Sequence, residues 1–429
     1  MHDLSTQSVR LEKAAAHLRG GRLRDAELLY RQVLAEAPQH VEAMRGLARV
    51  AERVGRLDAA ALILRQAVSG ALDHAALHAH LGELYRKLAR WDEAEAFCAR
   101  ATALDPALVD AWYNLGVVAQ VQGRFETAQT HYERVVKLDA HHAAGWYNLG
   151  HVLMALEDAA GAARCFERAS TLLPQEAEPW VNLGLAQEKL GAKNQALAAF
   201  ERALALGVSA RVRYHIAALT GRDVPAGAPP EHVTAVFDEM AERFDRHLVD
   251  KLDYHVPEKL TALLLHQRAA LGEVADLGCG TGLCGPLLKP HATRLVGVDL
   301  SPAMIAKAQA RGTYDELHVG EMNAFLASRP AAFDVALAAD VLVYVGDLQP
   351  LFAAVRRALR PGGLWAFSVE GHDGPGYLLR ATRRYAHSAA YLREAAHGFD
   401  VVVLEETMIR REAREPVTGY VAVLRAPVG

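Results

Sequence analysis

The first half of the chain repeats one pattern of apolar and polar positions with a constant step of 34 residues. One position of each step is always alanine, at Ala26, Ala60, Ala94, Ala128, Ala162 and Ala196. Four residues later stands a bulky or apolar side chain, at Tyr30, Leu64, Cys98, Tyr132, Phe166 and Phe200. This periodicity predicts six helix–turn–helix units, which begin at Gln7, Val41, Ala75, Val109, Ala143 and Ala177.

Glycines in the same register let the paired helices cross closely, at Gly82, Gly116, Gly150 and Gly184. The bulky column then fills the space between neighbouring units. A single unit cannot bury its own apolar face, so we expect a stack in which each unit contacts its neighbours. After Ala210, the helical pattern from Val212 to Leu219 predicts a helix that seals the end of the stack.

The second half alternates short apolar strands with helical segments, which predicts an α/β domain. Its first strand ends in Asp276-Leu277 and turns over Gly278, Gly280 and Gly282 into a helix. Further strands are expected at 295–299, 317–319, 364–369, 399–404 and 420–424, together with a strand that runs into a loop over 333–342 and a helix at 348–359. Glycine allows such a turn because it adopts backbone conformations closed to other residues and lets the chain approach a ligand.

Length and composition favour two soluble domains. The chain has 429 residues, of which 51% are hydrophobic and 23% charged. The segment 221–230 is dense in glycine and proline and is the natural boundary. We therefore expect a repeat domain at 1–220, a linker at 221–232 and an α/β domain at 233–429.

Charge and special residues narrow the function classes. The net charge of −4 gives no electrostatic footprint for nucleic acid. No apolar run reaches the length of a membrane span, and the N-terminus has no signal core, so we expect a cytoplasmic protein. The four cysteines show no spacing that indicates disulfide pairs. His74, His78 and His80 have no nearby cysteine or patterned carboxylate, so no metal site is expected. Repeat arrays often self-associate, which leaves a homo-oligomer open.

The glycine turn fits two kinds of nucleotide site. Gly280, Gly282 and Gly285 match the dinucleotide spacing, with Asp299 as the ribose-binding acid about twenty residues later. Gly278, Gly280 and Gly282 directly after Asp276 instead resemble the first motif of class I S-adenosylmethionine-dependent methyltransferases. The order of the following segments, including the Leu-Arg-Pro-Gly-Gly turn at 359–363, resembles that methyltransferase family and favours the second interpretation.

The first half likewise resembles tetratricopeptide repeats in its period and residue pattern. The two resemblances together imply an all-α tetratricopeptide solenoid followed by a Rossmann-like methyltransferase domain with a mostly parallel seven-stranded sheet. The methyltransferase resemblance implies S-adenosylmethionine as cofactor and S-adenosylhomocysteine as product. It implies a cofactor site made of Tyr254, Asp276, Gly278, Cys279, Gly280, Gly282, Asp299, Leu300, Met304, Glu321, Met322, Asp340 and Val341.

Within that site, the resemblance assigns the methionine end of the cofactor to Asp276 and the glycine turn. It assigns the ribose to Asp299 and the adenine to Glu321, where relatives usually carry aspartate. Phe244 and Tyr254 would lie in a helical lid, where they either cover the cofactor or pack the lid onto the sheet.

The acceptor side carries less information. Asp340, Tyr344 and His387 are the candidate catalytic residues, and they lie on loops at the carboxyl edge of the expected sheet. Glu370 and His372 lie at the same edge, and His387 or His372 is a candidate general base, although an exposed histidine without a role fits the sequence as well. Arg383-Arg384 either binds an acidic group of the substrate or is a solvated charge pair.

Tetratricopeptide solenoids present a concave groove to peptides or partner proteins. Asn114, Asn148 and Asn182 recur once per unit and would form a ladder of amides for a peptide backbone, although asparagine is also simply common at that position. The leading hypothesis is a methyltransferase whose repeats recruit a protein substrate. The alternatives are a small-molecule methyltransferase with repeats used for assembly, and an interaction protein that binds the cofactor without turnover.

Overall fold

The computed structural model describes residues 2–207, 209–241, 254–412 and 415–428. The chain divides into two compact units, Met1–Leu206 and Gly207–Gly429. Phe244, expected in the lid, lies outside the described residues.

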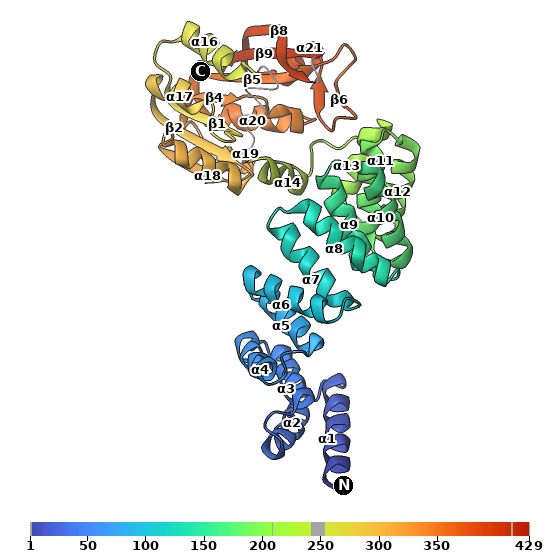
Figure 1. Cartoon of the computed structure of the whole chain (residues 1–429). Coiled ribbons are helices and arrows are strands. Elements are labelled where there is room, and N and C mark those ends of the chain that lie inside the picture. Colours follow the sequence, from blue (N-terminus) through green and yellow to red (C-terminus); the bar gives the residue numbers. More distant parts are fainter. Residues whose placement is uncertain (1, 208, 242–253, 413–414, 429) are drawn as a thin grey trace. The chain divides into compact units, whose positions relative to one another are not determined.

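The first unit consists of helix pairs stacked in sequence order (Figure 1). The first helices of the pairs are α1 (His2–Arg19), α3 (Val41–Arg53), α5 (Ala75–Lys87), α7 (Val109–Val121), α9 (Ala143–Ala155) and α11 (Ala177–Lys189). The second helices are α2 (Leu23–Glu36), α4 (Leu57–Gly70), α6 (Trp91–Leu104), α8 (Phe125–Leu138), α10 (Ala159–Leu172) and α12 (Lys193–Leu206). The first helices from α3 onward and the second helices from α2 onward begin at intervals of 34 residues, as predicted. The six-unit repeat pattern is therefore confirmed.

The two helices of a pair cross where glycine faces a bulky side chain. A Cβ placed on Gly116 would lie 2.6 Å from a ring carbon of Tyr132, and one on Gly150 would lie 2.6 Å from the ring of Phe166. Such distances are far inside van der Waals contact, so only glycine fits there. The alanine column is fully buried beside these rings, as Ala128 and Ala162 illustrate. The close crossing expected from the sequence is therefore confirmed.

The second unit is an α/β domain. Its helices are α13 (Ala210–Thr220), α14 (Pro230–Met240), α16 (Val256–Gln267), α17 (Gly285–Leu288), α18 (Pro302–Arg311), α19 (Met322–Ala327), α20 (Gln349–Ala358) and α21 (Ala389–Ala395). Its strands are β1 (Gly272–Leu277), β2 (Ala292–Asp299), β3 (Glu316–Val319), β4 (Phe333–Ala338), β5 (Leu359–Gly371), β6 (Tyr377–Leu379), β7 (Tyr385–His387), β8 (Asp400–Glu412) and β9 (Glu415–Arg425). Short 3₁₀ turns lie at Lys289–His291 and Leu342–Tyr344.

The sheet is mostly parallel, as expected. Strands β3, β2, β1, β4 and β5 run side by side in that order, and β9 returns antiparallel between β5 and β8. These make the seven strands that the sequence implied. The short hairpin β6–β7 extends the sheet to nine strands within the described part of the chain, because β7 pairs with the last residues of β5. The order reverses between β1 and β4, and such switch points are where open α/β sheets bind ligands.

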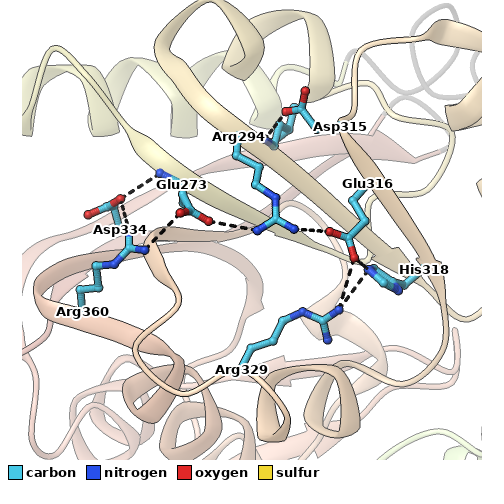
Figure 2. A network of polar contacts seen from close by, with 9 residues as sticks. Glu273, Arg294, Asp315, Glu316, His318, Arg329, Asp334 and Arg360 are labelled. Carbon is cyan, nitrogen blue, oxygen red and sulfur yellow. Dashed lines mark hydrogen bonds and ion pairs between the residues drawn. The ribbon is translucent and has the colours of Figure 1, made fainter.

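The amino ends of the parallel strands are joined by a network of ion pairs (Figure 2). Arg294 on β2 pairs with Glu273 on β1 and Glu316 on β3. Arg360 on β5 pairs with Glu273 and with Asp334 on β4. These side chains are partly exposed, so solvent screens the pairs and they add little stability. The network occupies the strand ends opposite to the carboxyl edge, where the candidate site lies.

Helix α13 lies in the second unit, although the sequence pattern assigned it to the end of the repeat array. Tyr214, Ala217 and Ala218 pack against Leu379 and Tyr385 of the β6–β7 hairpin. The Tyr214 hydroxyl also donates a hydrogen bond to the carbonyl of Arg383. The second unit therefore starts before the expected boundary at residue 220, because the apolar face of α13 is buried on this hairpin.

Candidate functional site

The glycine turn after β1 is held against the end of β2. The backbone N–H groups of Gly278 and Cys279 both donate to the carbonyl of Val298, at 2.7 and 3.0 Å. Gly278, Gly280 and Gly282 have φ values of 69°, 54° and 86°, which favour glycine. A Cβ on Gly278 would also lie 2.4 Å from Cγ2 of Val341. Glycine is thus required there by both backbone conformation and space.

Asp299 ends β2 beside this turn. One carboxylate oxygen, Oδ2, accepts from the N–H of Gly280, and the other, Oδ1, accepts from the N–H of Ser301, both at 2.9 Å. Burial raises the pKa of Asp299, and these backbone hydrogen bonds oppose that rise. The two bonds fix the carboxylate in one orientation on the wall of a cavity.

The cavity has a volume of about 460 Å³ and lies at the carboxyl ends of the strands. The expected site residues on its wall are Tyr254, Gly278, Cys279, Gly280, Asp299, Leu300, Glu321, Met322, Asp340, Val341 and Tyr344. A cavity of this size falls in the range of ligand pockets. The fold therefore brings most of the expected site residues to the wall of one cavity.

Four expected residues lie off this wall: Asp276, Gly282, Met304 and His387. Asp276 is buried behind the turn and accepts a hydrogen bond of 2.6 Å from the Tyr314 hydroxyl. Burial raises the pKa of Asp276 to about 7, and the Tyr314 hydrogen bond opposes the rise. Met304 is fully buried. Asp276 and Met304 are therefore buried in the fold and not exposed on the cavity wall.

Glu321 and Met322 follow β3, where the adenine contacts were expected. Glu321 caps α19, since its carboxylate accepts from the N–H of Ala324 at 2.8 Å and from the amide of Asn323 at 3.0 Å. Its side chain is therefore oriented by its own helix while it remains on the cavity wall.

Asp340 follows β4 in a left-handed conformation, with φ of 56°. Its Oδ1 accepts from Nη1 of Arg410 at 2.8 Å. Arg410 lies on β8, is fully buried, and also pairs with Glu370 and Glu412. Burial raises the pKa of Asp340, while the Arg410 charge opposes it. Sequence reasoning did not find Arg410, because nothing local marks one arginine of a strand as the partner of an acid 70 residues away.

His387 lies outside the cavity wall. It is fully buried, and its Nε2 is 3.0 Å from the carbonyl of Gly346. Burial lowers the pKa of His387 to about 4, so it stays neutral near pH 7. His372 contacts the backbone of its own loop, at Gly374 and Gly376. Neither imidazole is placed as a base toward the cavity.

The expected linker also forms part of the wall, through Ala226, Gly227 and Ala228. The N–H of Ala228 donates to the carbonyl of Tyr344 at 2.9 Å, and the carbonyl of Ala226 accepts from Gly346 at 2.8 Å. The segment is thus bonded to the loop after β4, and sequence reasoning did not place it in the site.

The three asparagines of the expected ladder form hydrogen bonds with other residues of the repeats. Asn114 is buried and accepts from Nε of Arg86 at 2.6 Å. The amide of Asn148 donates to the Tyr113 hydroxyl at 3.1 Å, and that of Asn182 to the Tyr147 hydroxyl at 3.0 Å. These bonds tie successive units together, and a peptide would have to share them.

The described residues contain neither a metal-binding cluster nor a membrane-spanning helix. Among them, no group of three or more His, Cys, Asp or Glu side chains is arranged to hold a metal ion. His80, one of the clustered histidines, instead pairs with Glu52. None of the described helices combines the length and the apolar character needed to cross a membrane.

Comparison with known families gives matches in both halves. A profile described as "Methyltransferase domain" matches residues 275–367. Profiles described as "Tetratricopeptide repeat" match residues 11–73, 76–109, 109–142 and 147–210. These matches confirm the two resemblances seen in the sequence.

Individual relatives cover parts of the chain. The "Ubiquinone biosynthesis O-methyltransferase" of Pseudomonas putida (strain GB-1) is 27% identical over 151 residues, which are 34% of this chain and 65% of that protein. The "Malonyl-[acyl-carrier protein] O-methyltransferase" of Salmonella typhimurium is 26% identical over 167 residues, 38% of this chain and 64% of that protein. The chain thus spans just under two thirds of the length of these two relatives. A solved structure described as "Functional Characterization of Pseudomonas Aeruginosa pilF" aligns at 16% identity and a TM-score of 0.45, over 48% of this chain and 94% of that one.

Proposed function

We propose that this chain, in which tetratricopeptide repeats are joined to a methyltransferase domain, transfers a methyl group from S-adenosylmethionine to an acceptor. The donor supplies a methyl group that its sulfonium already activates. The protein's task is therefore to hold donor and acceptor in line and to exclude water.

The observation that carries this proposal is the Asp299 carboxylate, fixed on the cavity wall by two backbone N–H groups. Each oxygen keeps a lone pair, so the carboxylate suits a pair of neighbouring ribose hydroxyls. Leu300 beside it and Met322, at the start of α19 after β3, would flank the adenine. The backbone at Gly278–Gly280 would approach the methionine end, with Asp340 facing the amino group.

Donor binding tests this arrangement. Asp299→Asn removes the charge and leaves one backbone N–H facing an amide nitrogen, so we expect about 10- to 100-fold weaker binding of S-adenosylhomocysteine. Asp315→Asn is the matched control, because Asp315 also accepts a backbone N–H but pairs with Lys289 away from the cavity. Calorimetric titration measures both variants. Equal affinity of Asp299→Asn and the wild type would remove the basis of the donor site.

We further propose that the acceptor is a protein recruited by the repeats. The support is the fusion itself, since a groove for peptides has little use in an enzyme of free small molecules. Donor with a labelled methyl group, incubated with the protein and an extract of its host, separates the cases. Label on a discrete protein supports recruitment, and label confined to small molecules contradicts it. Donor binding without transfer would favour a non-catalytic binding role.

A free small-molecule acceptor is the second candidate. The names of the two relatives and the apolar wall residues beside the donor side, such as Val236, Phe237 and Leu351, favour it. The name of the Salmonella relative describes a malonyl group that is attached to a carrier protein. A small group presented by a recruited protein would reconcile both candidates.

A further inference from the structure

Arg384 brings a positive charge to the cavity. It directly precedes β7 in the β6–β7 hairpin, and among the described wall residues it is the one lysine or arginine. A quarter of its side chain is exposed. Its neighbour Arg383 points elsewhere, since its guanidinium approaches Nδ1 of His215 on α13 at 3.4 Å. The side chains of Arg383 and Arg384 therefore have different surroundings, which the sequence alone did not distinguish.

Arg384 pairs directly with Glu412, and both acids that face it, Glu370 and Glu412, also pair with Arg410. Glu412 accepts from both Arg384 and the buried Arg410. Glu370 pairs closely with Arg410 and lies 3.9 Å from Arg384. Asp340 also pairs with Arg410, and Arg380 lies 3.5 Å from Glu370, so three carboxylates face three arginines and Arg384 completes the balance of this cluster. Arg384 is the cation on the cavity side of this cluster, with a planar set of donors that suits a carboxylate.

One part of the wall beside Arg384 is aromatic and apolar, and the carboxylate of Asp340 also lines the wall near it. The Tyr344 hydroxyl is hydrogen-bonded to Arg384. The ring of Phe237 meets the ring of Tyr344 edge-on, with centroids 5.4 Å apart. Val236 and Val343 also line the wall. A ligand that places an anion on Arg384 would therefore lay an apolar body against these side chains.

We propose that Arg384 binds the carboxylate of the methyl acceptor, and that the acceptor is an acid with an apolar body that is converted to its methyl ester. This inference rests on the proposed methyltransferase function and names the acceptor class of the same site.

The chemistry of a carboxylate acceptor suits this wall. An ionised carboxylate oxygen forms the new bond to the methyl carbon, the sulfur–carbon bond breaks, and its electron pair stays on the sulfur. One negative and one positive charge disappear, and no proton has to be removed. A hydroxyl or amine acceptor would need a base, and His387 is directed at the carbonyl of Gly346 instead.

The test uses the alkali lability of methyl esters. The full chain is incubated with methyl-labelled S-adenosylmethionine and an extract of its host, and the products are then treated with mild alkali. Esters release the label as volatile methanol, whereas methyl ethers and methylamines retain it. We expect most of the transferred label to become volatile, whether it lies on a protein or a small molecule.

Variants connect the result to Arg384. Arg384→Gln should raise the half-saturating amount of extract about 10- to 100-fold, with unchanged affinity for S-adenosylhomocysteine. Arg384→Lys should recover part of this loss, because it keeps the charge without the planar fork. Arg383→Gln is the matched control and should transfer like the wild type. With saturating donor, transfer should stay constant between about pH 6 and 9, since a carboxylate is ionised throughout.

Each contrary outcome is decisive. Alkali-stable label would overturn the carboxylate acceptor while leaving the methyltransferase function intact. Volatile label with an unaffected Arg384→Gln variant would overturn the role of Arg384. Donor binding with no label in any fraction would remove the proposed function, and this inference with it.

Discussion

The contact between the glycine turn and Val341 predicts how strongly the packing between β1 and β4 depends on the absence of a side chain at Gly278. Gly278→Ala forces alanine into a left-handed conformation with φ of 69°. It also places a Cβ 2.4 Å from Cγ2 and 2.7 Å from Cγ1 of Val341. Since Val341 follows Asp340 across the cavity, relief of this overlap must separate the ends of β1 and β4.

The cost has two parts. A left-handed alanine costs about 1–2 kcal/mol, and overpacking a tight contact adds about 1–3 kcal/mol. Gly312→Ala isolates the first part, because Gly312 has φ of 65° and its added Cβ would meet nothing within 4 Å. Gly278→Ala should therefore be less stable than Gly312→Ala by about 1–3 kcal/mol, the overlap alone.

Hydrogen exchange with mass spectrometry measures this difference in the full chain. Peptides covering β1 and β4 should exchange about 5- to 150-fold faster in Gly278→Ala than in Gly312→Ala, the equivalent of that free energy. Peptides from the repeats serve as an internal reference. Adding Val341→Ala should restore part of the protection, as expected for two residues in contact. Equal exchange in the two alanine variants, or no effect of Val341→Ala, would refute the packing argument.

Three further predictions concern single polar contacts. The raised pKa of Asp276, about 7 in the fold, means that its contribution to stability is present below about pH 3.8 and is lost as the pH rises through 7. Tyr314→Phe removes the hydrogen bond that opposes this rise, so thermal unfolding should show a larger loss of stability at about pH 8.5 than at pH 5.5; equal losses would argue against an ionised Asp276. His387→Asn should leave the pH profile of methyl transfer unchanged, because the pKa near 4 keeps the imidazole neutral, while the weakened contact to Gly346 lowers stability by about 1–3 kcal/mol. A shifted profile would restore His387 as a base. Asn182→Ala should destabilise the repeats by about 0.5–1.5 kcal/mol, because the hydrogen bond to Tyr147 of the preceding unit is lost. Denaturant unfolding measures this loss. Unchanged stability would mean that the amide is available to bind a peptide.

The repeat fold could be predicted because its decisive contacts are close in sequence. Gly116 and Tyr132 lie 16 residues apart within one unit, and the same pair recurs as Gly150 and Phe166. A period in the sequence therefore exposes the packing directly. The end of the array could not be predicted in this way. The apolar face of α13 looks the same from the sequence whether it covers a repeat or the β6–β7 hairpin.

The clustering of the residues proposed for the donor side was predictable for a similar reason. A strand, a glycine turn and the acid at the end of the next strand are local features, and Gly280 does bond to Asp299. The exact position of each side chain was not determined by the local sequence. The carboxylate of Asp276, expected at the methionine end of the cofactor, accepts a hydrogen bond from the Tyr314 hydroxyl, and no motif indicates this partner 38 residues later.

The acceptor side depends on segments that only the complete fold brings together. The backbone of 226–228 is bonded to the loop that carries Tyr344, and the Tyr385 hydroxyl donates to the carbonyl of Pro225 at 2.8 Å. Arg384 therefore belongs to a hairpin held by α13 and by the segment that follows it. Because these contacts span more than a hundred residues, no motif records them. This difference explains why the methyl donor can be inferred from the sequence, while the class of acceptor had to be inferred from the three-dimensional surroundings of one arginine.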